Sequence, residues 1–227
     1  MLISIQQPEF FPWIGYFHKL MNVDKVVFLD SVQFKKRYFE NRNKIRTHNG
    51  WCWIRIPVQT KGKYNQNIND VLIDNSIKWK HKLCQTIESN YKKSPFWKDL
   101  GDDLLSIILC SHSRLSNLNL QIIIYLMDRL NIKIDWCLSS SLLTKSKGSD
   151  LIIEICQILS AKQYLSGING KQYLIENDFK AKKIGLRYQN FTHPRYKQFH
   201  GDFIPYMSVI DLIFNHGEDA RSIILDS

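Results

Sequence analysis

The chain has 227 residues, of which 44% are hydrophobic and 12% are aromatic. This composition supplies apolar material for one large or two small folded domains, and it excludes an intrinsically disordered chain. The formal net charge of +10 and the isoelectric point of about 9.3 predict an anionic partner. A nucleotide, a phosphorylated substrate, RNA and an acidic membrane surface all fit that description.

The distribution of cysteine and histidine argues against disulfides and metal centres. The five cysteines are dispersed, odd in number and free of C-x-x-C spacing, and the seven histidines include no H-x-x-x-H pair. We therefore expect reduced thiols and no metal site. The chain also opens without a signal peptide and contains no apolar run long enough to cross a bilayer, so we expect a cytoplasmic protein.

The first thirty residues have the pattern of a βαβ unit. Residues 2–5 form an apolar strand candidate, a helical run follows to Asn22, and residues 24–30 form a second apolar strand candidate. Crossovers of this kind are almost always right-handed, so both strands end at the same edge of the sheet. Ligands of open α/β sheets bind at that edge.

The residues between these strands, together with Asp30 at the end of the second, are candidates for a ligand pocket. Amides, a carboxylate and aromatic rings gather there, and three of these residues suit catalysis: Gln7, His18 and Asp30. Five more are candidates for substrate binding: Gln6, Pro8, Trp13, Gly15 and Tyr16. The alternative is that the prolines stiffen a loop and the rings belong to the core.

Residues 31–50 interleave basic and aromatic side chains, which favours anion binding. Lys35, Lys36, Arg42 and Asn43 are the candidates for contact with phosphate groups. A solvated basic loop is the alternative. The Asn49-Gly50 turn signal predicts a hairpin that pairs the segment around residues 44–46 with a strand at 51–57.

Helical periodicity dominates the middle of the chain. Apolar stripes predict helices near residues 77–91, 95–108 and 118–130, preceded by a short strand at 71–74. We interpret residues 76–131 as a helical insertion. Residues 1–75 and 132–227 then form one α/β domain that resembles a nucleotide-binding domain.

Strands and helices alternate again after the insertion. Strands are expected at 132–138, 163–167 and 186–191, with helices at 149–159 and 176–184. This alternation predicts a three-layer, Rossmann-like α/β fold with a mainly parallel sheet. Ser166 and Gly167 open a glycine-containing turn, and Tyr196 lies in a long loop, so all three are candidates for substrate binding. Ser208 and Asp211 have the spacing of a helix-capping box, which we prefer to a catalytic serine.

These motifs resemble the WbqC-like family. The resemblance rests on Gln7-Pro8 with the run 11–16, on Asp30 with 33–36, on 41–45, on 164–167, and on 208–217. Glu9 stands where an aromatic residue is commoner in the family. A fainter likeness to nucleotidylyltransferases rests on Gly15 and His18, but the second histidine of their H-x-G-H motif is missing.

The resemblance implies a cytoplasmic role in making O-antigen or other surface polysaccharides. We expect a transferase that adds an acyl or aminoacyl group to a nucleotide-linked amino sugar. Acyl-CoA or aminoacyl-tRNA would be the donor, and no tightly bound cofactor is expected. The alternatives are a nucleotide- or tRNA-binding protein without catalysis of its own, and an enzyme similar to the nucleotidylyltransferases. The sequence predicts neither the sugar nor the oligomeric state.

Overall fold

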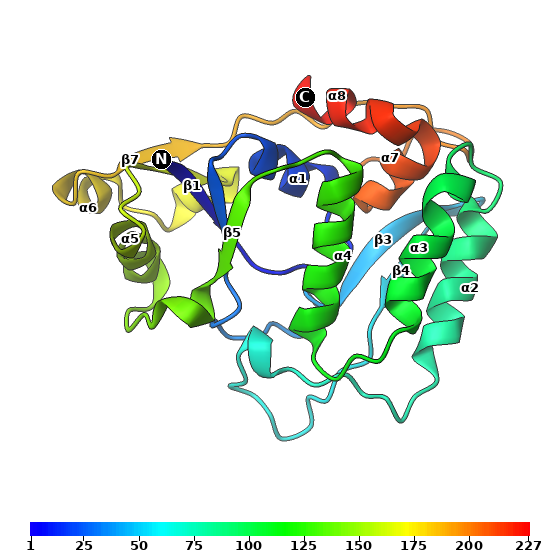
Figure 1. Cartoon of the computed structure of the whole chain (residues 1–227), viewed down its shortest axis with the longest axis horizontal. Helices are drawn as coiled ribbons and strands as arrows, with labels where there is room; N and C mark the ends of the chain where they lie inside the picture. The colour runs from blue at the N-terminus through cyan, green and yellow to red at the C-terminus, as the bar shows by residue number, and fades with distance from the viewer.

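A five-stranded parallel sheet forms one half of the computed structural model, which describes residues 1–227 (Figure 1). The strand order is β5-β2-β1-β6-β7 and every neighbouring pair is parallel. The strands are β1 (Leu2–Gln6), β2 (Lys25–Phe28), β5 (Asp135–Leu138), β6 (Gln163–Ser166) and β7 (Gly185–Tyr188). The predicted mainly parallel α/β sheet is confirmed.

Helices cover both faces of this sheet because its central strands β1 and β2 are buried on both sides. Ile3 and Ile5 of β1 pack with helix α5 (Gly148–Ile158) and helix α6 (Glu176–Ala181). On the other face, Phe28 of β2 belongs to a second core that includes helix α1 (Ile14–Met21). Two separate hydrophobic cores on either side of one sheet give the predicted three-layer arrangement.

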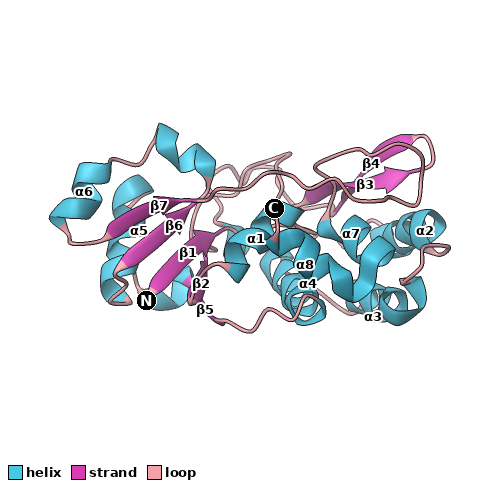
Figure 2. Ribbon diagram, turned by 90° about the horizontal axis from the view of Figure 1, so that it is seen from above, coloured by secondary structure: helices cyan, strands magenta, loops and turns pink.

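The other half of the molecule consists of helices and an antiparallel hairpin. Figures 1 and 2 place these elements at the opposite end from α6. The hairpin pairs β3 (Arg42–Thr47) with β4 (Gly50–Arg55), and the helices are α2 (Trp79–Tyr91), α3 (Trp97–Leu109), α4 (Leu115–Arg129), α7 (Val209–His216) and α8 (Ala220–Leu225). They share one continuous core with α1. The separation of residues 76–131 as a subdomain stays a prediction.

One local expectation is wrong, and one helix was not predicted. The segment expected as a strand at 71–74 follows a short 3-10 helix, η1 (Ile68–Asp70). Leu72 bridges to Arg114 while Ile73 bridges to Val58, so consecutive residues pair with different segments and no ladder forms. The C-terminal helix α8 was not expected. Short 3-10 helices η2 (Ser139–Leu142), η3 (Ile168–Gln172) and η4 (Gly217–Asp219) complete the chain.

None of the helices combines the length and the apolarity that a bilayer span requires.

A buried carboxylate on α7 holds the hairpin, α2 and the C-terminal loop together. Asp211 accepts hydrogen bonds from the Tyr91 hydroxyl (3.0 Å), the Tyr196 hydroxyl (2.9 Å) and the Gln198 side-chain amide (2.8 Å). Tyr91 Oη in turn accepts the backbone N–H of Arg46 on β3 at 3.0 Å. Burial raises the pKa of Asp211, and these hydrogen bonds oppose the shift. Ser208 Oγ accepts the N–H of Ile210, which confirms Ser208 as the helix N-cap.

We expect Asp211→Ala to lower the free energy of unfolding by about 3 kcal/mol, because several buried donors lose their acceptor. Asp211→Asn keeps one carbonyl acceptor and should cost less. Urea denaturation measures both, and Asp226→Ala at the exposed C-terminus is the control. A cost of under about 0.5 kcal/mol for Asp211→Ala, the size of an ordinary surface change, would contradict this role.

Candidate functional site

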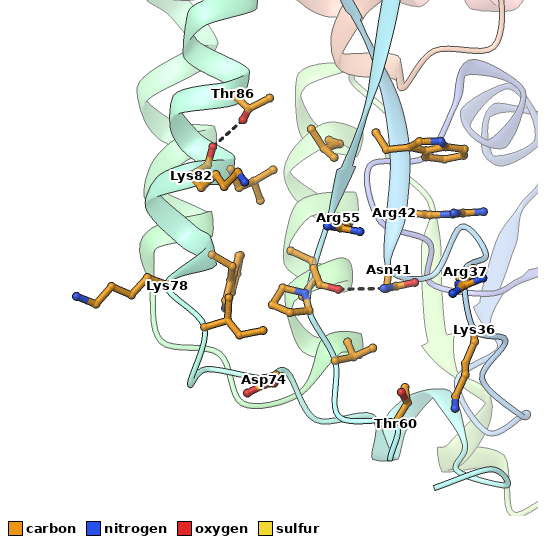
Figure 3. Close-up of a pocket in the computed structure, with 18 of the residues that line it drawn as sticks. Lys36, Arg37, Asn41, Arg42, Arg55, Thr60, Asp74, Lys78, Lys82 and Thr86 are labelled. Atoms are coloured by element: carbon orange, nitrogen blue, oxygen red, sulfur yellow. Dashed lines mark hydrogen bonds between the residues drawn. The ribbon is translucent and has the colours of Figure 1, made fainter. Parts of the chain in front are cut away.

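A cavity of about 820 Å³ lies between the 34–42 loop, the hairpin and the start of α2 (Figure 3). Its volume is within the range of small-molecule sites, roughly 300–1,000 Å³. The charged residues in its lining are six cations and one carboxylate: Lys36, Arg37, Arg42, Arg55, Lys78, Lys82 and Asp74. This imbalance gives the cavity a positive potential, which favours anions.

The hairpin directs two arginines to the same side. Arg42 and Arg55 are direct partners across the antiparallel ladder, so their side chains share one face. Neither belongs to any ion pair, since the salt bridges of the chain lie elsewhere. The Arg42 guanidinium stacks 4.2 Å from the centre of the Trp53 ring, and its Nε is buried without a partner. Two facing cations without a carboxylate leave a place for an anion between them.

Other basic-loop candidates divide between the cavity and the core. Lys36 lines the cavity, with its Nζ 4.9 Å from the Tyr64 ring centre, whereas exposed Lys35 is not in the lining. The Asn43 side chain is buried and donates to the carbonyl oxygens of Phe10 (3.3 Å) and Phe11 (2.7 Å). Asn43 therefore anchors the loop after β1.

Most of the candidate residues at positions 6–16 stabilise the loop after β1. Gln6 Nε2 donates to the carbonyl oxygen of Tyr16 at 3.2 Å, and the Tyr16 hydroxyl donates to the carbonyl oxygen of Gln7 at 3.0 Å. The ring of Trp13 lies over Gly15, where a Cβ would come within 2.4 Å of the indole. These contacts explain the glycine and fix the half-buried Gln7 at the sheet edge. Pro8 is held through its carbonyl oxygen, which accepts from Asn119.

The remaining candidates make structural contacts. Gln189 Nε2 donates to His18 Nδ1 at 2.8 Å, and burial lowers the pKa of His18 so that it is neutral at pH 7. The Asp30 carboxylate accepts from Ser139 Oγ (2.9 Å), Ser140 N (2.9 Å) and Ser140 Oγ (2.7 Å). It thus joins the end of β2 to η2, after β5. The Tyr196 hydroxyl is bound to Asp211.

The strand order identifies a second place for a ligand. From β1 the chain passes to β2 and β5 on one side, then returns to β6 and β7 on the other. The topological switch point, where ligands of such sheets bind, therefore lies between the carboxyl ends of β1 and β6. Gln6 and buried Ser166 end these strands. Lys19 of α1 reaches this edge, with its Nζ 3.9 Å from where a Cβ on Gly167 would lie.

Sequence reasoning missed an ionisable cluster at this edge. Lys19 is only 8% exposed, and burial lowers its pKa to about 8, although nearby Glu9 raises it. Burial raises the pKa of partly buried Glu9 to about 8, with Glu40 adding to the shift and Lys19 opposing it. Glu40 is fully buried. The sequence did contain one signal for this cluster: Lys19 lies among the apolar residues Phe17, Leu20 and Met21 of the first helix.

The structure contains no group of three or more His, Cys, Asp and Glu side chains that could hold a metal ion.

The pH dependence of stability should report on Glu9. The folded state keeps the Glu9 proton up to about pH 8, whereas an unfolded glutamate loses it near pH 4.5. Stability from this group is therefore present below pH 4.5 and is lost as the pH rises to 8. Relative to wild type, Glu9→Gln should gain at least about 1.4 kcal/mol between pH 5 and 8, the equivalent of one pKa unit.

Thermal melts across that pH range measure the difference, and exposed Glu218→Gln is the control. A difference between Glu9→Gln and wild type that stays constant with pH would contradict the raised pKa of Glu9.

Comparison with known proteins places the chain in a family. The sequence model of the WbqC-like protein family matches residues 7–223. An uncharacterized protein of Mycobacterium tuberculosis is 32% identical over 220 residues, which cover 96% of this chain and 95% of that protein. No solved structure matches the chain. The match includes the loop after β1, the basic hairpin and α7, and the chain belongs to the WbqC-like protein family.

Proposed function

We propose that this protein transfers an acyl or aminoacyl group to the amine of a nucleotide-linked amino sugar. The main support for this proposal is the cavity beside the hairpin, whose lining contains six basic side chains and a single carboxylate. A nucleotide sugar is a small molecule with two adjacent phosphates, so its size and charge suit this cavity. Family membership supports a role in the synthesis of O-antigen or another surface polysaccharide.

Arginine in the cavity suits a diphosphate. The guanidinium of Arg42 offers a planar fork that can donate two parallel hydrogen bonds, and Arg55 lies opposite it on the same face. The Trp53 ring already holds Arg42 by a cation–π contact, which limits the loss of side-chain freedom on binding. Trp79 also lines the cavity, as an apolar wall that is only 5% exposed.

The reaction needs few groups from the protein. The lone pair of the sugar amine attacks the acyl carbonyl carbon and forms the C–N bond. The bond from carbon to the leaving group breaks, which is a C–S bond in a thioester donor or a C–O bond in an aminoacyl-tRNA. The amine loses a proton and the leaving group gains one. Positioning, proton removal and oxyanion stabilisation supply the catalysis, without a covalent nucleophile.

A second candidate function is RNA binding without catalysis. Its support is the outer face of the hairpin, where Trp51 is 43% exposed and Trp53 is 37% exposed. Lys44 Nζ lies 4.2 Å from the Trp51 ring centre and 5.4 Å from that of Trp53. Exposed rings between cations are typical of surfaces that bind single-stranded nucleic acid. Such binding should weaken steeply with salt, whereas sugar-nucleotide binding should depend on salt much less.

We expect Arg42→Lys to weaken binding of a nucleotide sugar by about 1.5–3 kcal/mol, because lysine cannot form the paired hydrogen bonds. Its melting temperature should stay close to that of wild type. Calorimetric titration with a panel of UDP-, GDP- and dTDP-linked sugars, together with a melt, measures both quantities.

The matched control is Lys98→Gln, an exposed cation on α3 outside the cavity. If Arg42→Lys binds the sugars as wild type does, the diphosphate assignment is wrong. Binding of tRNA in place of every sugar nucleotide would favour the second function.

A further inference from the structure

The edge between β1 and β6 holds an ammonium group without a partner. Lys19 is buried and belongs to none of the ion pairs of the chain. A buried charge is costly unless it is paired and hydrogen-bonded, so structural lysines are rarely left in this condition. The position of Lys19 Nζ beside Gly167, at the topological switch point, indicates a ligand group of opposite charge.

Unpaired carboxylates accompany this ammonium. Glu9 lies in the loop after β1 and is partly buried. Its carboxyl group forms no ion pair with Lys19. Neither oxygen of fully buried Glu40 has a hydrogen-bond partner. When Glu9 is ionised, its carboxylate and the Lys19 ammonium are therefore near each other without forming an ion pair. A ligand that carries both charges close together would complement them.

We propose that the edge between β1 and β6 binds an α-amino acyl group, with Lys19 donating to its carboxyl oxygen and Glu9 accepting from its amine. This inference rests on the proposed transferase and narrows its donor to an aminoacyl compound.

The protein around the cluster keeps its charges in place. The carbonyl oxygens of Pro8 and Glu40 both accept from the buried side chain of Asn119, at 2.8 and 2.7 Å, so the loop after β1 and the basic loop are fixed together. Phe10 N–H donates to the carbonyl oxygen of Phe39 on the same two segments. The site is therefore preorganised, which reduces the entropy lost when a ligand binds.

Binding should be coupled to ionisation. The groups that face Glu9 are Glu40, Tyr16 and Lys19, and Lys35 acts on Glu40. With a pKa of about 8, free Glu9 is mostly protonated at pH 7, and an ammonium ligand beside it would expel that proton. Lys19, with a pKa of about 8, loses its charge at higher pH. Affinity for a zwitterion should therefore peak near pH 8 and fall on both sides.

The test is a calorimetric titration of the full chain with each of the twenty common amino acids as free probes. At least one should bind, with release of a proton at pH 7 that is detected by comparing buffers of different ionisation enthalpy. The matching amine without the carboxylate, and the matching carboxylic acid without the amine, should each bind at least about tenfold more weakly.

Substitutions test whether the amino acid binds at the edge between β1 and β6. Lys19→Met and Glu9→Gln, both close in shape to the native side chains, should each weaken amino-acid binding at least about tenfold, and Glu9→Gln should also abolish proton release. Exposed Lys133→Met and Glu218→Gln are the matched controls. Melts establish that each variant is folded.

Three outcomes would overturn the inference: no amino acid binds at millimolar concentration, the carboxylic acid binds as well as the amino acid, or folded variants bind like wild type. These outcomes are independent of the proposed function, because sugar-nucleotide binding and its loss in Arg42→Lys are measured in separate titrations.

Discussion

The hydrogen bonds of Asp211 are the constraint on which the arrangement of the hairpin depends. This one carboxylate is bound to α2, to the long C-terminal loop and, through Tyr91, to the backbone of β3. The outer face of the hairpin then presents Arg42 and Arg55 to the cavity, while Ile45 on its inner face belongs to the core. A buried acid outside the cavity thus helps to fix the strand that carries Arg42.

The overall fold was predictable because its strands are short, apolar and separated by helical patterns. The βαβ unit at the start and the alternation after residue 132 led directly to a parallel sheet. The strand expected at 71–74 failed because its residues bridge to Arg114 and Val58, which are far apart in sequence. Local patterns carry no information about such partners.

The sites were predictable only where residue type determines the role. Arg42 was found from charge and aromatic neighbours, and it lines the cavity. Asp30 and Asn43 are also polar, yet their side chains are engaged in tertiary hydrogen bonds. Asp30 accepts from Ser139, and Asn43 donates to the carbonyl oxygen of Phe11. The Glu9 and Lys19 cluster escaped notice because ten residues separate them, and only the turn after β1 and the helix α1 bring them to one edge.

The stacking of Arg42 on Trp53 has a practical consequence for the study of this protein. An indole that touches a guanidinium and remains 37% exposed responds to both charge and solvent in its excited state. A ligand that draws Arg42 off the ring, or replaces water above it, changes the emission of that tryptophan. The cavity therefore contains its own optical reporter, and the difference in emission between wild type and Trp53→Phe would isolate its signal.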